Sequence, residues 1–410
     1  MHLILKNARL VTMEEGSTGY TPTEPCYLLI RSGLIVAIGE DLSTLYGNTP
    51  KEWSDCLVLD CAGSIVTPGL IDPHTHLVFA GSRAQEFEAR LNGESYQAIA
   101  QRGGGINSTV ASTRAASVDE LIELALPRLD SLIKSGCTTI EVKSGYGLTL
   151  EDEAKMLVAA KSLENHRRVS ITTTLLAAHT VPPEYQDRAD DYINYVVNDI
   201  IPHVAKHNLA DSVDVFCESI GFTLEQTERV FDAAKAHGLA VKGHTEQLSN
   251  LGGSVLAAQY KAQSVDHIEY LDQAGVKALA ASGTVATLLP GAFYFLRETQ
   301  LPPIEWLREF NVPMAIGSDI NPGTSPFADL QLMMNMACTL FRLTPEEALR
   351  GVTCHAAAAI GQKDTIGQIR KGFKANLAIW DIDHPSELSY QYGLKGLKQR
   401  IFAGSIEHVA

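Results

Sequence analysis

Eight short apolar segments recur along the middle of the chain and alternate with helical patterns. They lie near residues 66–71, 137–142, 169–175, 212–217, 239–243, 262–266, 284–288 and 312–317. In the helical pattern at Ser117–Ala125, Ser117 and Glu120 form a predicted capping box. Eight strands that alternate with helices match the count of a parallel barrel. We therefore predict an α/β protein with a (β/α)8 TIM barrel over residues 66–364.

Both ends of the chain have a different pattern, in which short apolar runs are separated by Gly, Pro and Asn. Before the first barrel segment these runs lie at 3–5, 8–11, 27–30, 34–38 and 56–60. The pattern returns in Gly367–Asp381 and Arg400–Gly404. Runs of this kind are typical of strands joined by turns. We predict that residues 1–65 and 365–410 meet in one small composite β-sandwich.

The composition limits the partners and the cellular location that we expect. The chain has 410 residues and is 45% hydrophobic, so it can bury a large core. Its 33 basic and 48 acidic residues give a net charge of −15, which argues against nucleic acid and anionic membranes as partners. Seven scattered cysteines without a Cys-x-x-Cys pair are typical of a reduced, cytoplasmic protein. With no apolar run of about 18 residues and no signal-peptide pattern, we expect no membrane span.

The first barrel segment leads directly into the motif Asp72–His76, which contains His74 and His76. Side chains two positions apart in a strand point the same way, so both imidazoles are expected on one face. Imidazole is a good ligand for zinc and iron. The motif therefore predicts half of a metal site, and the other ligands must come from elsewhere in the chain.

Four later segments also end in a residue that can bind a metal ion. His179 follows the third segment, His244 the fifth, His267 the sixth and Asp319 the eighth. The carboxyl ends of barrel strands meet at one face of the fold, where active sites lie. These four endings, together with the His-Thr-His motif, favour one shared site over a set of unrelated loop residues.

With these motifs the chain resembles the amidohydrolase superfamily over nearly its whole length. The resemblance implies a metal-dependent hydrolase, and the metal ligands that it implies are His74, His76, His244 and Asp319. Two-ion members carry a bridging lysine at the end of strand four, where this chain has Glu218. The resemblance therefore implies one zinc or iron ion per chain. Lys143, at the end of strand two, is then expected to be a structural cation or one that supports the ligands.

Five further blocks are similar to the imidazolonepropionases, a family within that superfamily. They are Phe79–Phe87, Lys143–Leu148, Ala178–Pro182, His244–Ser249 and Asp319–Ser325. The resemblance implies a hydrolase that acts on a carbon–nitrogen bond of a cyclic amide. Its substrate would be 4-imidazolone-5-propanoate and its product N-formimidoyl-L-glutamate, in histidine degradation. Gln247 stands where some members carry Glu, and because an amide cannot shuttle protons we expect Gln247 to orient the substrate.

The chemistry of this reaction suggests roles for the residues around the ion. Asp319 accepts a proton from the attacking water and returns it to the leaving nitrogen, and His267 hydrogen-bonds the water or the developing oxyanion. Arg83 suits the propanoate carboxylate because a planar guanidinium can bind both oxygens, although a surface salt bridge is an equal alternative. The other residues expected to contact substrate are Tyr146, His179, Gln247, Asn321, Gly323 and Thr324.

Two other functions are compatible with the pattern. A single-ion aminohydrolase that deaminates a nucleobase would share the ligands, would use a Glu just after the strand-five histidine and would not need Arg83. A barrel that has lost catalysis and serves in assembly would be expected to lack ligands, and all four are present.

Several features are left open by the sequence. It does not distinguish zinc from iron, and a homodimer is expected only as the commonest closed assembly. Gly103–Gly105 lacks the lysine of a phosphate-binding loop and predicts a flexible loop, with a lid over the barrel mouth as one interpretation.

Overall fold

A barrel of parallel strands forms the larger part of the molecule. The computed structural model describes residues 2–14, 16, 19–41, 56–94, 104–394 and 396–407. The strands are β6 (Leu70–Asp72), β7 (Cys137–Lys143), β8 (Ser170–Ala178), β9 (Ser212–Cys217), β11 (Gly243–Thr245), β12 (Ser264–His267), β13 (Val285–Leu288) and β14 (Met314–Ile316), and each pairs with the next. A short strand, β10 (Ala240–Val241), also pairs with β9. All of these pairings are parallel, so the predicted barrel is confirmed.

Hydrogen bonds beyond the regular strands link the first and last strands. The Asp319 N–H donates to the His74 carbonyl at 2.9 Å, and the His76 N–H donates to the Ile320 carbonyl at 3.0 Å. The segment that leaves β14 is therefore held directly beside the segment that leaves β6.

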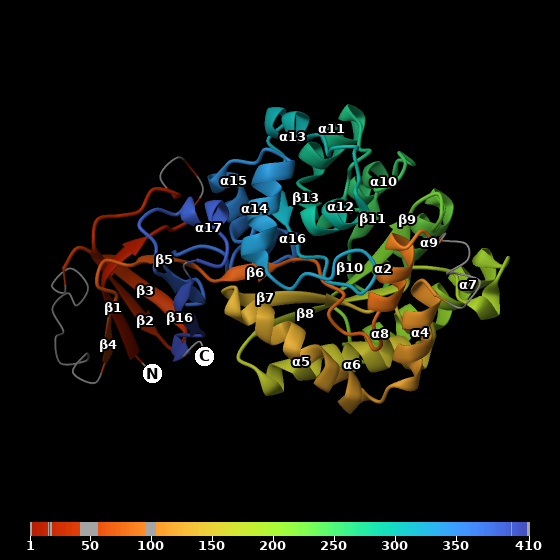
Figure 1. Cartoon of the computed structure of the whole chain (residues 1–410), viewed down its shortest axis with the longest axis horizontal. Coiled ribbons are helices and arrows are strands. Elements are labelled where there is room, and N and C mark those ends of the chain that lie inside the picture. The colour runs from red at the N-terminus through yellow and green to blue at the C-terminus, as the bar shows by residue number, and fades with distance from the viewer. Residues whose placement is uncertain are drawn as a thin grey trace.

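Helices follow each barrel strand and cover its outer face (Figure 1). The predicted capping box is confirmed, because Ser117 Oγ accepts from the Glu120 N–H and the Glu120 carboxylate accepts from the Ser117 N–H. The helices are α2 (Ala84–Leu91), α4 (Ile106–Ala115), α5 (Val118–Lys134), α6 (Leu150–His166), η2 (Pro183–Tyr185), α7 (Ala189–Tyr195), η3 (Val196–Ile200), α8 (Ile201–Lys206), α9 (Leu224–Ala236), α10 (Gly253–Gln259), α11 (Gln273–Ser282), α12 (Pro290–Leu296), α13 (Ile304–Glu309), α14 (Leu330–Leu340), α15 (Pro345–Gly351), α16 (Cys354–Ala359) and α17 (Glu387–Tyr390).

Strands from both ends of the chain form a second, mixed sheet at the left of Figure 1, where both termini also lie. They are β1 (His2–Leu10), β2 (Cys26–Arg31), β3 (Leu34–Gly39), β4 (Leu57–Asp60), β5 (Ile65–Pro68), β15 (Leu377–Trp380), β16 (Leu397–Phe402) and β17 (Ser405–Glu407). β1 pairs with β2 and β4 through its first half and with β5 through its last residues. Side chains from both parts of the sheet share one buried apolar cluster, including Leu5, Val66 and Leu377. The predicted composite of the two ends is confirmed, whereas the boundaries 1–65, 66–364 and 365–410 remain a prediction.

The apolar run near 66–71 is expected to form one barrel strand, and this expectation is wrong. The run forms two strands in two different sheets: β5 pairs with β1 and β15, and β6 pairs with β7. The change occurs at Pro68-Gly69, where the Gly69 N–H donates to the Asn376 carbonyl at 2.8 Å. A side chain at Gly69 would collide with Thr138, so a glycine is needed for the chain to cross between the sheets.

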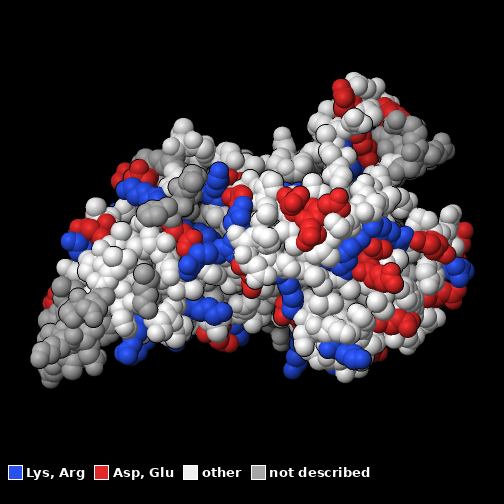
Figure 2. Space-filling view, turned by 90° about the horizontal axis from the view of Figure 1, so that it is seen from below, with Lys and Arg blue, Asp and Glu red and all other residues white. Residues whose placement is uncertain are grey.

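The surface carries charges of both signs. Figure 2 shows acidic and basic side chains side by side across much of the face in view. Dissolved salt also screens the field of exposed charges beyond about 8 Å at physiological ionic strength. Among the described residues, the helices are too short or too polar for a membrane span.

Candidate active site

Metal-competent side chains converge at the carboxyl ends of the barrel strands. Asp319 Oδ1 lies 3.4 Å from His74 Nε2 and 3.5 Å from His76 Nε2. The His244 ring centroid is 4.6 Å from that of His74 and 5.5 Å from that of His76. All four side chains are buried. The structure thus brings together the four residues that the sequence indicated as metal ligands.

The atoms of this cluster fit one transition-metal ion. Ligand atoms on a tetrahedral zinc ion with bonds of about 2.1 Å lie about 3.4 Å apart, which matches the separations of the Asp319 oxygen from the two imidazoles. His74 Nε2 and His244 Nε2 are buried without a hydrogen-bond partner among the described residues. Because such atoms are costly to bury unpaired, a bound cation would account for both of them at once.

Burial also keeps the histidines in the form that binds metals. It lowers the pKa of His74 well below the ordinary value, and the nearby Lys143 ammonium adds to this effect. Burial likewise lowers the pKa of His76, with a further contribution from His179. Both imidazoles are therefore neutral at neutral pH, as metal coordination requires.

His267 lies beside the same cluster. Its ring centroid is 5.4 Å from that of His244 and 6.0 Å from that of His74. Burial and the neighbouring His244 lower the pKa of His267 to about 3, so its ring is neutral as well. Its ligand-competent atoms also group with those of His74 and His244, so geometry alone allows a role either as a ligand or as a hydrogen-bonding group.

Asp319 and His267 share an unusual backbone conformation. Their φ angles are 52° and 82°, in the left-handed region that residues with a side chain rarely adopt. Such conformations cost free energy and cluster at functional sites, where the surrounding structure imposes them. Burial raises the pKa of Asp319 to about 7, against the lowering effects of His244 and Asn321.

Two aspartates behind the histidines were missed by the sequence reasoning. Asp266 Oδ2 accepts a hydrogen bond from His74 Nδ1 at 2.7 Å, and Asp214 Oδ2 lies 3.0 Å from His244 Nδ1. Each aspartate interrupts a buried apolar strand, β12 and β9 respectively, and this was the signal that could have identified them. A carboxylate at Nδ1 orients the ring and leaves Nε2 for a metal.

Arg83 is held beside the strand-eight loop by Glu86. The Arg83 Nε and Nη2 groups donate to the Glu86 carboxylate, which also accepts from the Gly105 N–H at 2.9 Å. The third nitrogen, Nη1, lies against Gly323, where any added side chain would collide with it. Arg83 thus uses one edge in an ion pair and retains the Nη1 side for another partner. The lid interpretation of Gly103–Gly105 falls partly outside the described residues.

Tyr146 and His179 flank the histidine cluster. The His179 ring stacks on His76 with centroids 5.4 Å apart, and the Tyr146 ring centroid is 5.9 Å from that of His76. His179 Nδ1 lies 3.0 Å from the Gly145 carbonyl, which fixes the proton on Nδ1. Burial and His244 lower the pKa of His179 to about 4, and burial raises the pKa of Tyr146. At neutral pH His179 therefore offers Nε2 as an acceptor, whereas Tyr146 keeps its proton.

The loop after β14 is stabilised by its own side chains. Asn321 Oδ1 accepts from the Gly323 and Thr324 N–H groups at 2.8 and 2.7 Å. Asn321 Nδ2 donates to the Asp319 carbonyl and to Thr324 Oγ1. These contacts hold Gly323 against Arg83 and fix the approach of the loop to Asp319.

The two glutamates near Gln247 have structural contacts. Glu246 accepts from the Gly252, Gly253 and Ser254 N–H groups at the start of α10. Glu218 accepts from the Leu248 and Ser249 N–H groups at 2.8 and 3.3 Å. The Glu246 and Glu218 carboxylates therefore fix the backbone on both sides of Gln247. The Glu246 carboxylate is already hydrogen-bonded within its own loop.

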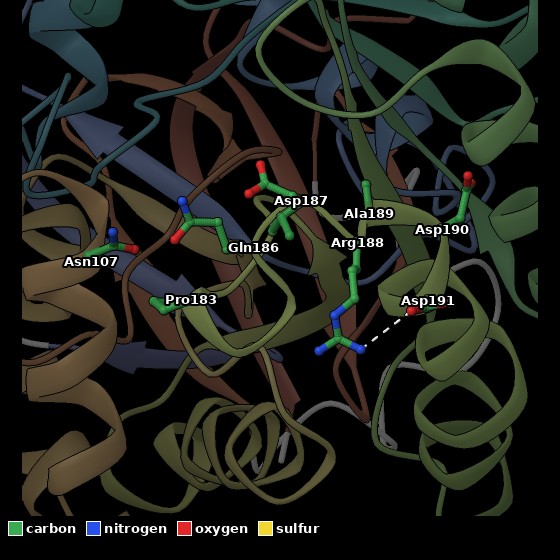
Figure 3. Close-up of a pocket in the computed structure, with 9 residues that line it drawn as sticks. Asn107, Pro183, Gln186, Asp187, Arg188, Ala189, Asp190 and Asp191 are labelled. Carbon is green, nitrogen blue, oxygen red and sulfur yellow. Dashed lines mark hydrogen bonds and ion pairs between the residues drawn. The ribbon is translucent and has the colours of Figure 1, made fainter.

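Two cavities lie near these loops. One, of about 540 Å³, is lined by Arg83 and Asn321 together with apolar groups that include Phe79, Phe87 and Phe295. The other, of about 880 Å³, lies along η2 and the start of α7 (Figure 3). It is lined by Asn107, Val181, Pro183, Gln186, Asp187, Arg188, Ala189, Asp190 and Asp191. None of these residues was expected to bind substrate. The smaller cavity, which Arg83 and Asn321 line, is therefore the one that adjoins the proposed active site.

Comparison with known proteins agrees with this geometry. The model of the Amidohydrolase family matches residues 65–407. The imidazolonepropionase of Vibrio cholerae is 66% identical over 408 residues, covering 100% of both chains. A solved triazine hydrolase variant has a TM-score of 0.74 at 16% identity and covers 99% of this chain and 94% of its own. The 5-methylcytosine deaminase of Klebsiella pneumoniae has a TM-score of 0.71 at 15% identity, with coverage of 98% and 96%.

The two solved structures share the fold with this chain. At 15% and 16% identity they show nothing about its function. The family model spans most of the chain, and the identity with the Vibrio protein extends over its full length. The chain belongs to the amidohydrolase family and, within it, to the imidazolonepropionases.

Proposed function

We propose that the protein hydrolyses the ring amide of 4-imidazolone-5-propanoate to give N-formimidoyl-L-glutamate. Water adds across one carbon–nitrogen bond: its oxygen joins the ring carbonyl carbon, which becomes a carboxylate, and a proton goes to the ring nitrogen that leaves. Histidine degradation is the context in which relatives of this family use the reaction.

His74, His76, His244 and Asp319 would hold one zinc or iron ion in this proposal. When bound, such an ion supplies Lewis acidity, which lowers the pKa of a water toward about 7 and polarises a carbonyl. The support for this assignment is the set of buried, unpartnered imidazole nitrogens around the Asp319 carboxylate.

Asp319 is the proposed proton carrier. Its buried carboxylate lies within 3.5 Å of the His74 and His76 imidazoles, so it is placed to take the proton of the attacking water and deliver it to the leaving nitrogen. The hydrogen bonds from Asp319 N–H to His74 and from Asn321 Nδ2 to the Asp319 carbonyl fix its backbone on both sides. The carboxylate therefore needs little rearrangement to act.

His267 is the proposed hydrogen-bonding group for the developing oxyanion. Its lowered pKa keeps it neutral, so one ring nitrogen carries a proton to donate. A fixed donor aimed at developing charge in a site closed to water stabilises a transition state more than it does the substrate.

Arg83 is the proposed partner of the propanoate tail. Glu86 holds the guanidinium by its Nε–Nη2 edge, which leaves the Nη1–Nη2 edge to bind a carboxylate. Asn321, Gly323 and Thr324 shape the loop that faces Arg83. We propose that Tyr146, His179 and Gln247 contact the imidazolone ring of the substrate. The unprotonated Nε2 of His179 can accept a hydrogen bond from a ring N–H.

The observation that carries the proposal is the grouping of His74, His76 and Asp319, with His244 against His74, together with a fixed guanidinium beside the same strand-eight loop. The test is an assay of ring opening on freshly prepared 4-imidazolone-5-propanoate, with elemental analysis of the same sample to identify the ion. Turnover of this substrate by wild-type protein that contains about one zinc or iron per chain is the expected result.

Deamination of a nucleobase is not favoured. That chemistry uses a glutamate just after the strand-five histidine, and Glu246 is already engaged by three backbone N–H groups of its own loop. The following residue is Gln247, which cannot transfer a proton. A neutral nucleobase also has no carboxylate for Arg83 to bind, although Glu86 holds that guanidinium at the site.

A further inference from the structure

A lysine ammonium is buried behind the proposed ligands. Lys143 ends β7 with 1% exposure, and its Nζ lies 2.8 Å from Glu141 Oε1, 2.9 Å from Asp214 Oδ2 and 3.6 Å from Asp266 Oδ2. Burial alone would lower the pKa of this lysine, but the Asp214, Glu141 and Asp266 carboxylates outweigh burial and raise it. Lys143 is therefore a permanent positive charge inside the barrel.

Two of the three carboxylates around Lys143 are those that contact the histidines. Asp266 accepts from His74 Nδ1, and Asp214 lies against His244 Nδ1. A carboxylate at Nδ1 favours the tautomer with its proton there, so the Nε2 lone pair is free for a metal. One ammonium thus contacts the partners of two proposed ligands on different strands, since His74 follows β6 and His244 lies in β11.

The two aspartates need a cation between them. Ligand-competent atoms of Asp214, His244 and Asp266 lie within 4.8 Å of one another, and the Lys143 ammonium is within 3.6 Å of both carboxylates. Lys242 also acts on Asp266, but the Lys143 ammonium lies against both carboxylates. Without it, two buried carboxylates so close together would repel each other and move apart, so their hold on the imidazole rings would weaken.

We propose that Lys143 is a positioning residue, which holds Asp214 and Asp266 and through them fixes the Nδ1-protonated tautomer and the ring orientation of His74 and His244. The inference rests on the ion site of the proposed function. It assigns to Lys143 an effect on metal affinity, beyond any effect on the stability of the barrel.

The test is the affinity of metal-free protein for Zn²⁺, measured by competition with a chromophoric chelator. Lys143→Met keeps the length of the side chain and removes its charge. Arg400→Met is the matched control, because Arg400 is also a buried cation, with 3% exposure, but donates to the Cys137 and Arg168 carbonyls beside the terminal sheet. Both variants are first checked for folding by circular dichroism.

Lys143→Met should raise the Kd for Zn²⁺ by about 10- to 100-fold, the usual range when a group that supports a metal ligand is lost. Arg400→Met should leave the Kd unchanged. An unchanged Kd in Lys143→Met, or an equal rise in both variants, overturns the proposal.

Lys143→Met leaves carboxylates without a counter-charge and can fail to fold, so the tautomers of the wild type provide a second measurement. Nitrogen NMR spectra of histidine-labelled, metal-free protein should show the ring proton on Nδ1 of both His74 and His244. A proton on Nε2 of either ring overturns the inference. Wild-type protein that binds no Zn²⁺ would instead overturn the proposed function, so the two failures are distinguishable.

Discussion

The Asp319 N–H donates to the His74 carbonyl at 2.9 Å, and this bond joins the segment after the last barrel strand to the segment after the first. It places the Asp319 carboxylate 3.4 Å from the His74 imidazole. Closure of the barrel and assembly of the proposed ion site therefore depend on the same contact. A change that disturbs the site should be tested for metal content and folding as well as for activity.

Replacement of Asp319 by Asn should remove nearly all turnover, because an amide oxygen is a poor base. The expected loss in kcat is on the order of 10²- to 10⁴-fold, the range for a general acid–base group. The measurement is kcat on variant protein that has been loaded with metal and analysed for it. A metal-loaded Asp319→Asn protein with wild-type kcat would rule out the proposed proton path.

Replacement of His267 by Ala separates two roles that the geometry allows. If His267 stabilises the oxyanion, the variant should keep its metal and lose on the order of 10²-fold or more in kcat. The measurement pairs elemental analysis with steady-state kinetics. Loss of the ion in His267→Ala would show that this residue is a ligand instead, as its grouping with His74 and His244 permits.

Replacement of Arg83 by Ala should weaken recognition of the propanoate tail. Removal of one partner from an enclosed charge pair costs about 2–5 kcal/mol, which is roughly 30-fold to several thousand-fold in kcat/KM at about 1.4 kcal/mol per decade. Arg83→Lys should restore only part of this, since an ammonium cannot bind both carboxylate oxygens in one plane. The measurement is kcat/KM on the substrate and on a ring analogue without the carboxylate.

The analogue decides the interpretation of Arg83, because it never uses the contact and should show a much smaller defect. Gly323→Ala gives a steric control, since a methyl group there collides with the Arg83 guanidinium and should raise KM for the substrate. Equal losses on both compounds would assign Arg83 a structural role.

The ion pair between Arg308 and Glu347 predicts a pH-dependent contribution to stability. Arg308 Nε and Nη2 donate to the two Glu347 oxygens at 2.7 and 2.8 Å. Burial opposes ionisation of Glu347, but the hydrogen bond from Arg308 and that from the Thr344 N–H hold its pKa below the ordinary value of 4.5. Because the folded-state pKa is the lower one, the stabilisation is complete above pH 4.5 and is lost as pH falls through the folded-state pKa.

Glu347→Gln should therefore lower the free energy of unfolding by roughly 1 kcal/mol at neutral pH. The gap between variant and wild type should narrow as pH falls below 4.5, in denaturant titrations at several pH values. Glu305→Gln is the control, since Glu305 pairs with the same arginine but is 87% exposed, and it should change little. A gap that is constant with pH would assign the effect to packing or to the capping of α15.

The barrel and the place of its site could be predicted because both depend on local pattern. Each strand is a short apolar run, and the metal-competent residue lies at or just after its carboxyl end, as with His244 in β11 and Asp319 after β14. The boundary at Pro68-Gly69 was missed, although Pro-Gly is a turn signal in the sequence, because apolar residues flank it on both sides. The break depends on a hydrogen bond to Asn376 and on the proximity of Thr138, which only the folded chain provides.

The pattern also could not show which charged groups meet behind the proposed ligands. Asp214, Asp266 and Lys143 lie on three different strands, so their contacts depend on the register of β7, β9 and β12 around the barrel. The sequence shows that each is a charged residue in a buried strand, but it does not show which charges meet. The same holds for Glu86: a salt bridge of Arg83 was one of two equal expectations, but the sequence did not identify Glu86 as its partner.

The most direct measurement of the central claim is ring opening of 4-imidazolone-5-propanoate by wild type, by metal-depleted protein and by His74→Ala, with the metal content of each sample. The account predicts about one zinc or iron per chain in the active wild type and loss of activity on chelation, with recovery on reloading. His74→Ala should have neither ion nor turnover. Two ions per chain, full metal content in His74→Ala, or undiminished turnover by metal-free wild type would contradict it.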